Sequence, residues 1–167
     1  LMVEAGRIDH GHHAGNAYRA FSDTVALSDA VKKALEKVDL EDTLVIVTAD
    51  HSHTMTLAGY PKRGNPILGK VIGTDSTSFE LAPGDAVYGT PTAAGRVADM
   101  TAVDTTDPDF HQEALVPMGS ETHAAEDVQI FAGGPKAHLF HGVQEQSYIF
   151  HVMKDAFSFK SSKREED

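Results

Sequence analysis

The stretch that decides the fold class runs Thr43-Leu-Val-Ile-Val-Thr-Ala-Asp-His-Ser-His53. Its first six residues form a short, continuous apolar run with β-branched side chains, which is typical of a central parallel strand covered on both faces. A polar Asp50-His51 pair follows almost directly. In sheets of parallel strands, ligands bind beyond the carboxyl ends of the strands. The stretch therefore predicts a buried strand that ends in a binding site.

The segments before this strand complete a βαβ unit. The apolar residues 1–3 are predicted to be the end of another buried strand, so we expect the chain to be a fragment of a larger domain. A helix is predicted from Asn16 to Lys37, because its apolar residues recur at three- and four-residue steps and Asn16 suits an N-cap. This order indicates an α/β fold with a central, mostly parallel sheet flanked by helices.

The remaining sequence divides by composition. A segment rich in Gly, Pro, Thr and Asp is predicted to form an inserted, small β-rich subdomain. After it, residues 127–132 regain strand character, and residues 147–159 are predicted to form a final helix with Ser147 as its N-cap. The expected parts are residues 1–58 and 118–159 of the α/β domain, the insert 59–117, and a charged, disordered tail, 160–167.

Composition narrows the classes of function. The 167 residues contain 14 basic and 25 acidic side chains, and the net charge of −11 argues against nucleic acid or an anionic membrane surface as partner. The absence of cysteine excludes disulfides and thiolate zinc sites. The sequence does contain ten histidines, which are clustered and close to carboxylates. Such clusters favour zinc sites of the catalytic kind, built from His, Asp and Glu.

Three polar clusters contain candidate metal ligands. In Glu4-Ala-Gly-Arg-Ile-Asp-His-Gly-His-His13, Asp9 and His13 are four residues apart and would share one face of a helical turn. A catalytic zinc takes three protein ligands, so a third must come from a distant segment. Asp50 and His51 form the second cluster, and two clusters imply two nearby ions. An alternative interpretation of the first cluster is a polar loop with surface histidines. The third cluster surrounds His123, and its residues also fit a helix capping box.

These clusters resemble signature segments of a known family. With Glu121-Thr-His-Ala-Ala-Glu-Asp127, they occur in the order found in the C-terminal half of alkaline phosphatases, and residues 137–146 are similar to the animal branch. The resemblance implies an alkaline-phosphatase-like fold whose insert is a crown-type subdomain. It also implies a homodimeric, extracellular or cell-surface hydrolase of small phosphomonoesters. Two Zn²⁺ ions and one Mg²⁺ ion would be its cofactors, and a lipid anchor its only attachment to a membrane.

The resemblance further implies a role for each candidate residue. It assigns the first zinc to Asp9, His13 and His123, the second zinc to Asp50 and His51, and the magnesium to Glu4. His10 would lie near the magnesium and the substrate phosphate. His53 would hydrogen-bond Asp9 and fix its orientation. The histidines that would be structural are His12, His138, His141 and His151.

The sequence also departs from the family pattern. Ala5, Ala124 and Ala125 stand where glycines are usual, and each would cost about 1 kcal/mol if its position required a positive φ. The family's Asp-Ser-Ala nucleophile segment and its phosphate-binding arginine do not occur. Asp75-Ser76-Thr77 is rejected as nucleophile because it lies in the insert. We therefore expect the serine to lie upstream and this chain alone to be inactive.

Two alternatives stay open at this point. One is a related two-metal hydrolase, such as a phosphodiesterase or sulfatase, since the same Asp-His motif at a strand end serves there. The other is a catalytically dead protein with a binding or structural role. The match at residues 142–146 and the third segment favour the phosphatase.

Overall fold

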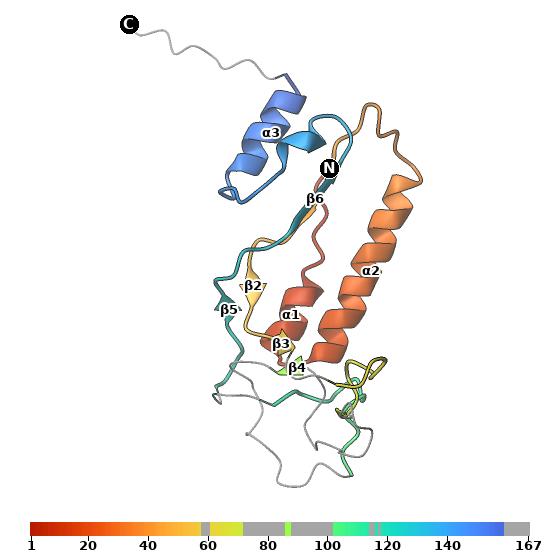
Figure 1. The fold of residues 1–167 in the computed structure, drawn as a ribbon, viewed down its shortest axis with the longest axis vertical. Helices are drawn as coiled ribbons and strands as arrows, with labels where there is room; N and C mark the ends of the chain where they lie inside the picture. The colour runs from red at the N-terminus through yellow and green to blue at the C-terminus, as the bar shows by residue number, and fades with distance from the viewer. Residues whose placement is uncertain (58–60, 72–85, 88–101, 114–115, 117, 159–167) are drawn as a thin grey trace, which may run out of the picture. The chain divides into compact units, whose positions relative to one another are not determined.

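The computed structural model describes residues 1–57, 61–71, 86–87, 102–113, 116 and 118–158 (Figure 1). Its helices are α1 (Arg7–His13), α2 (Ala17–Leu35) and α3 (Tyr148–Ala156), with a 3-10 turn η1 (Ala137–Leu139). Its strands are β1 (Val45–Thr48), β2 (Ser52–His53), β3 (Thr56–Leu57), β4 (Ala86–Val87), β5 (His123–Ala124) and β6 (Ile130–Gly133). The chain divides into two compact units: Leu1–Val31 with His51–Glu126, and Lys32–Asp50 with the chain from Asp127 onward.

The first unit is built on a close approach of α1 to α2. Gly11 lies inside α1 and is buried, and a Cβ atom there would lie 2.7 Å from the backbone nitrogen of Ala20 in α2. Only glycine allows the two helices to come this close. Asn16 connects them as the N-cap of α2, because its Oδ1 accepts a hydrogen bond from the Arg19 N–H at 2.9 Å. The predicted helix and its cap are thus confirmed.

Residues of the predicted insert contact the first turn of α2. The Asn16 amide donates to the Pro108 carbonyl at 2.8 Å, and the Ala17 N–H donates to the buried Gln112 side chain at 2.6 Å. These bonds satisfy polar groups at the start of the helix that would otherwise lack partners. The boundaries drawn near residues 59 and 117 lie outside the described residues, as do the tail from residue 160 and Ser76. The crown-type subdomain therefore remains a prediction.

The sheets differ from the expected central parallel sheet. In the described part of the chain they are two-stranded and antiparallel, pairing β1 with β6, β2 with β5 and β3 with β4. In the second unit, β1 pairs from Val45 opposite Gly133 to Thr48 opposite Ile130. Its three apolar residues are half-buried rather than covered on both faces. Among the described residues, β6 is the one strand paired with it. Residues 1–3, predicted as a strand, are exposed coil.

The second unit places α3 after a tight turn. Gly134 has φ 98°, and a Cβ atom there would lie 2.1 Å from the Thr43 carbonyl oxygen, so glycine is required for both reasons. Lys136 then forms an ion pair with Asp155 of α3 at 2.8 Å. Helix α3 begins directly after Ser147, as predicted, although the Ser147 side chain makes no capping bond.

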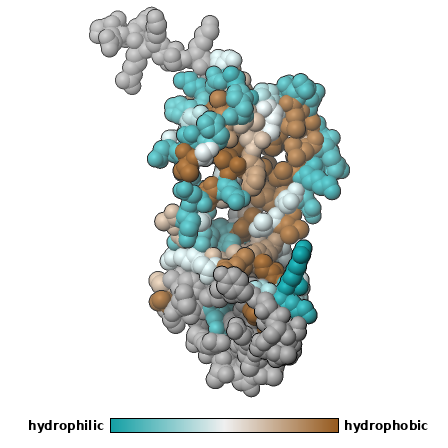
Figure 2. Space-filling model, viewed as in Figure 1, coloured by the Kyte–Doolittle hydropathy of each residue, from teal (hydrophilic) through white to brown (hydrophobic). Residues whose placement is uncertain are grey.

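The surface of the second unit keeps large hydrophobic side chains exposed. They are Leu35, Leu40, Phe131, Val143, Phe150, Met153 and Phe157. Figure 2 shows hydrophobic surface between hydrophilic patches at α3 and the β1–β6 sheet. No helix among the described residues is long and apolar enough to cross a membrane.

The alanines that replace the family's usual glycines are not strained. Among the described residues other than glycine, positive φ angles occur at Lys136 and Ser158 alone. Ala5, Ala124 and Ala125 therefore have ordinary backbone conformations, and the conditional cost of about 1 kcal/mol at each does not apply.

Candidate metal centre

Helix α1 places the first two candidate ligands. Asp9 and His13 are one turn apart, and Asp9 Oδ1 lies 3.3 Å from His13 Nε2. The helix already begins at Arg7, so Gly11 lies inside it rather than opening a turn. The predicted shared face is therefore formed, and both side chains are about one-third exposed.

The β2–β5 sheet brings the third candidate ligand to the same point. His53 pairs with His123 across the two strands, although they are 70 positions apart in the numbering. His123 Nε2 lies 3.4 Å from Asp9 Oδ1 and 3.1 Å from His13 Nε2. This convergence joins α1 to a strand that follows the insert.

The spacing of these three atoms fits a zinc ion. Zinc bonds to N and O ligands of about 2.0–2.1 Å, arranged as a tetrahedron, put neighbouring ligand atoms about 3.3 Å apart. The three separations among Asp9, His13 and His123 are 3.3, 3.4 and 3.1 Å. The side chains are 35%, 34% and 47% exposed, so one side of the cluster faces solvent. That open side is what a catalytic rather than a structural zinc site requires.

His51 lies in the same group of donors. Its Nε2 is 3.8 Å from Asp9 Oδ1, and its ring stacks on that of His123 with centroids 3.5 Å apart. One atom from each of Asp9, His51, His53 and His123 lies within 4.8 Å of the others. The cluster thus contains more nitrogen donors than one tetrahedral ion needs.

Three other predicted site residues are not brought into this group. Asp50 belongs to the second unit, is exposed, and accepts a hydrogen bond on its backbone carbonyl from Gln146. Glu4 is exposed in the segment before α1, and His10 is exposed on α1. A second group of metal-compatible donors consists of His13, His53 and Glu121. Among the described residues, neither this group nor the first contains Asp50, Glu4 or His10.

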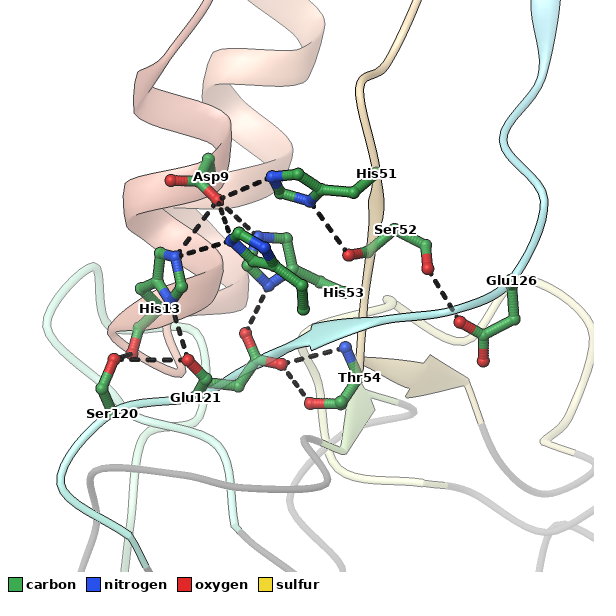
Figure 3. Close-up of polar contacts among 10 residues, drawn as sticks. Asp9, His13, His51, Ser52, His53, Thr54, Ser120, Glu121 and Glu126 are labelled. Carbon is green, nitrogen blue, oxygen red and sulfur yellow. Dashed lines mark hydrogen bonds and ion pairs between the residues drawn. The ribbon is translucent and has the colours of Figure 1, made fainter. Parts of the chain in front are cut away.

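Behind the candidate ligands lies a buried polar layer (Figure 3). His53, 6% exposed, forms a hydrogen bond between its Nε2 and Asp9 Oδ1 and another between its Nδ1 and Glu121 Oε2, both at 2.7 Å. Glu121 has a fully buried side chain, and its Oε1 accepts from the Thr54 N–H at 2.9 Å and from the Thr54 hydroxyl. Sequence reasoning missed Glu121. The available signal was its place two residues before His123, since an extended chain points such side chains the same way.

Comparison with known proteins identifies the family. The model of the alkaline phosphatase family matches residues 1–159. The chain belongs to the alkaline phosphatase family. It is 45% identical over 161 residues to the tissue-nonspecific alkaline phosphatase of Felis catus, and 44% identical over 156 residues to that of Rattus norvegicus. Each match covers 92% of this chain and 30% of the relative, so the chain spans under a third of the length of these curated relatives.

The electrostatics of this alkaline phosphatase segment suit a cation site. Burial raises the pKa of Asp9, but the hydrogen bond from His53 and the charges of His13, His53 and His123 outweigh it, so the pKa lies below its usual value. Asp9 is therefore ionised at neutral pH. Burial lowers the pKa of His12 to about 4, helped by the nearby His53, on whose ring it stacks at 4.7 Å. An ionised carboxylate surrounded by imidazole rings agrees with membership of a metal-dependent family.

Proposed function

We propose that this chain supplies the metal-binding part of a phosphate monoester hydrolase, an alkaline phosphatase with two zinc ions and one magnesium ion. The observation that carries the proposal is the triangle of Asp9, His13 and His123, whose donor atoms lie 3.1–3.4 Å apart. Family membership supports it independently. The serine nucleophile and the phosphate-binding arginine would lie outside these 167 residues.

Each residue of the proposed site has a distinct task. Asp9, His13 and His123 would hold one zinc, His51 with Asp50 would hold the second, Glu4 would serve the magnesium, and His10 would lie near the phosphate. A pair of such ions stabilises the attacking and the leaving oxygen of an in-line displacement at phosphorus. The half-exposed side of the cluster leaves a path for the phosphate group. His53, on the buried side, holds the Asp9 carboxylate by a hydrogen bond.

The wider setting of the enzyme follows from the same family. We propose small phosphomonoesters as substrates, a homodimer as the assembly, and an extracellular or cell-surface location. The relatives are named as tissue-nonspecific alkaline phosphatases of animals, which supports this setting.

The test uses the complete gene product that contains these residues, assayed with an aryl phosphate before and after removal of metal. We expect a chelator to abolish phosphate release and zinc with magnesium to restore it. His123→Ala should lower kcat/KM by at least about 100-fold, because residues that merely support a ligand already contribute about 10–100-fold. His138→Ala, an exposed histidine outside the cluster, is the matched control and should change the rate less than about twofold. Metal-independent hydrolysis, or full activity in H123A, would contradict the proposal.

The 167-residue chain assayed alone gives a second measurement. It should bind zinc and release phosphate negligibly, since the family's nucleophile segment does not occur in it. Turnover of about one per second or faster, within the range of ordinary enzymes, would show that a nucleophile lies within the chain. Ser52 and Ser76 would then be the first residues to substitute.

A further inference from the structure

We propose that Glu121 is a positioning residue that fixes the orientation of two metal-facing side chains, Asp9 and His13, from the buried side of the site. The inference rests on the proposed metal site and deepens it. Glu121 is one of three side chains, with His13 and His53, whose polar atoms lie within 4.8 Å of one another. The role proposed for it is to act on the ligands through named hydrogen bonds, not to bind the ion itself.

The burial of Glu121 is the first argument. Moving a carboxylate out of water is strongly unfavourable unless hydrogen bonds replace its hydration. The Glu121 side chain is fully buried, and both of its oxygens are hydrogen-bonded: Oε2 to His53 Nδ1, and Oε1 to the N–H and hydroxyl of Thr54. Both oxygens are therefore occupied, and the carboxylate is held in one orientation. Such a group is suited to orienting its partners.

The side chain of Glu121 acts on Asp9 through His53. The imidazole ring lies between the two carboxylates, with 2.7 Å hydrogen bonds at each nitrogen. Fixing one ring nitrogen fixes the direction of the other, so Glu121 sets the angle at which His53 Nε2 reaches Asp9 Oδ1. That oxygen is the atom from which His13 and His123 are 3.3 and 3.4 Å away. Outer hydrogen bonds of this kind commonly orient metal ligands.

The backbone of Glu121 acts on His13 directly. The Glu121 carbonyl accepts a hydrogen bond from His13 Nδ1 at 2.7 Å, and the Glu121 N–H donates to the His13 carbonyl at 3.0 Å. With Nδ1 engaged, His13 presents Nε2 to Asp9 and His123. One residue therefore orients two of the three candidate ligands, by its side chain for Asp9 and by its backbone for His13. A substitution of the side chain should disturb only the first of these two effects.

The alternative is that Glu121 merely joins β2 to β5, and the experiment separates the two. Glu121→Gln keeps the size of the side chain but has one acceptor oxygen, so either His53 or Thr54 faces an amide NH₂ instead. Glu126→Gln is the matched control, because Glu126 is an exposed carboxylate of the same segment that accepts from Ser52, beside His53, without reaching Asp9. The complete gene product is titrated with Zn²⁺ against a chromophoric chelator, and with Co²⁺ to record its visible spectrum.

We expect E121Q to lower the Zn²⁺ affinity about 10–100-fold and to alter the Co²⁺ spectrum, and E126Q to change the affinity less than about twofold. A second test asks whether Glu121 acts through His53. His53→Asn keeps a donor toward Glu121 but lacks the Nε2 atom that reaches Asp9. In the H53N background, E121Q should cause little further loss, because coupled residues are not additive. The proposal would be overturned if the fold-losses of Zn²⁺ affinity multiplied in the double variant, or if E121Q bound Zn²⁺ with normal affinity.

The far-UV circular dichroism of the metal-free protein shows whether a variant has misfolded. If E121Q loses its fold, Thr54→Val replaces it, because that change removes only one donor to the same carboxylate. A folded T54V protein with unchanged Co²⁺ spectrum and Zn²⁺ affinity would equally overturn the proposal. Zinc binding without phosphatase activity would sink the proposed function but leave the role of Glu121 intact, and no zinc binding at all would sink both.

Discussion

The exposed and buried sides of the candidate metal centre use the same residue types in opposite ways. On the exposed side, the side chains of Asp9, His13 and His123 are one-third to one-half accessible, and one nitrogen or oxygen atom of each lies within 3.4 Å of the other two. On the buried side, the side chains of His53 and Glu121 are 6% and 0% accessible. Both ring nitrogens of His53 and both carboxylate oxygens of Glu121 are hydrogen-bonded. A carboxylate near histidines is thus a ligand candidate where solvent can reach it, and a positioning group where it is buried with both oxygens hydrogen-bonded.

The largest effect should come from the exposed side. Asp9→Asn keeps the shape of the side chain but removes the charge that faces four imidazole rings. Zinc affinity should fall by at least about 100-fold, more than for a residue that only supports a ligand. Asp29→Asn, an exposed change on α2, should leave the affinity within about twofold. Chelator competition measures both, and comparable losses in the two variants would erase the distinction between the site and the rest of the acidic surface.

The next prediction tests whether the contact between α1 and α2 positions the ligands of the exposed side. Gly11→Ala should destabilise the metal-free protein by about 1–3 kcal/mol, because the new Cβ would meet the backbone of Ala20 and force α1 away from α2. It should also weaken zinc binding, since Asp9 and His13 move with α1. Gly119→Ala has no atom within 4 Å of its new Cβ and should change stability by less than about 0.5 kcal/mol. Equal stability of the two variants in urea would show that the helix contact does not position the site.

A smaller effect separates buried from exposed polar side chains at helix starts. Asn16→Ala removes a buried N-cap and its bond to Pro108, and should cost about 1–2 kcal/mol of unfolding free energy. Ser147 occupies the same position before α3 but makes no capping bond, so Ser147→Ala should cost less than about 0.5 kcal/mol. Urea unfolding curves of the two variants supply the comparison. A larger loss for S147A would reverse it.

The smallest effect concerns an exposed carboxylate. The hydrogen bond from the Ser52 hydroxyl lowers the pKa of Glu126 below its usual value. Because the folded-state pKa is depressed, the stabilisation is present above the unfolded pKa near 4.5 and is lost as the pH falls through the lowered value. Melting temperatures of the unaltered protein and E126Q should differ slightly at pH 6 and converge by pH 3. A difference that grows in acid would contradict the assignment.

Local features of this chain were predictable, and distant partnerships were not. Helix α2 and its Asn16 cap follow from spacing and cap chemistry within a few residues, so their boundaries agree closely with the structure. Strand β1 was also predicted, but its partner β6 lies 85 positions away. An apolar run does not indicate whether the neighbouring strand is parallel or antiparallel. The central parallel sheet was therefore an inference from composition, and the described residues do not contain it.

The candidate site divides in the same way. Asp9 and His13 are recognisable from their four-residue spacing, whereas His123 needed the family resemblance to be connected with them. Glu121 escaped notice because its importance comes from burial and from a partner 68 positions away, neither of which a single sequence displays. Asp50 remains a prediction from its place after an apolar strand, and Glu4 and His10 remain predictions from the resemblance.

The bonds of Glu121 to His53 and Thr54 have a consequence for folding and for tolerance of length change. They tie together chain positions 67 and 68 apart and so close the base of a long excursion. Loop-closure entropy grows only with the logarithm of length, so doubling that excursion would add about 0.6 kcal/mol. A change in the length of that stretch therefore costs little in loop closure, provided that Pro108 and Gln112 keep their hydrogen bonds to the start of α2. Because contacts between distant chain positions form slowly, we expect the centre to assemble late in folding, after both ends of the excursion have met.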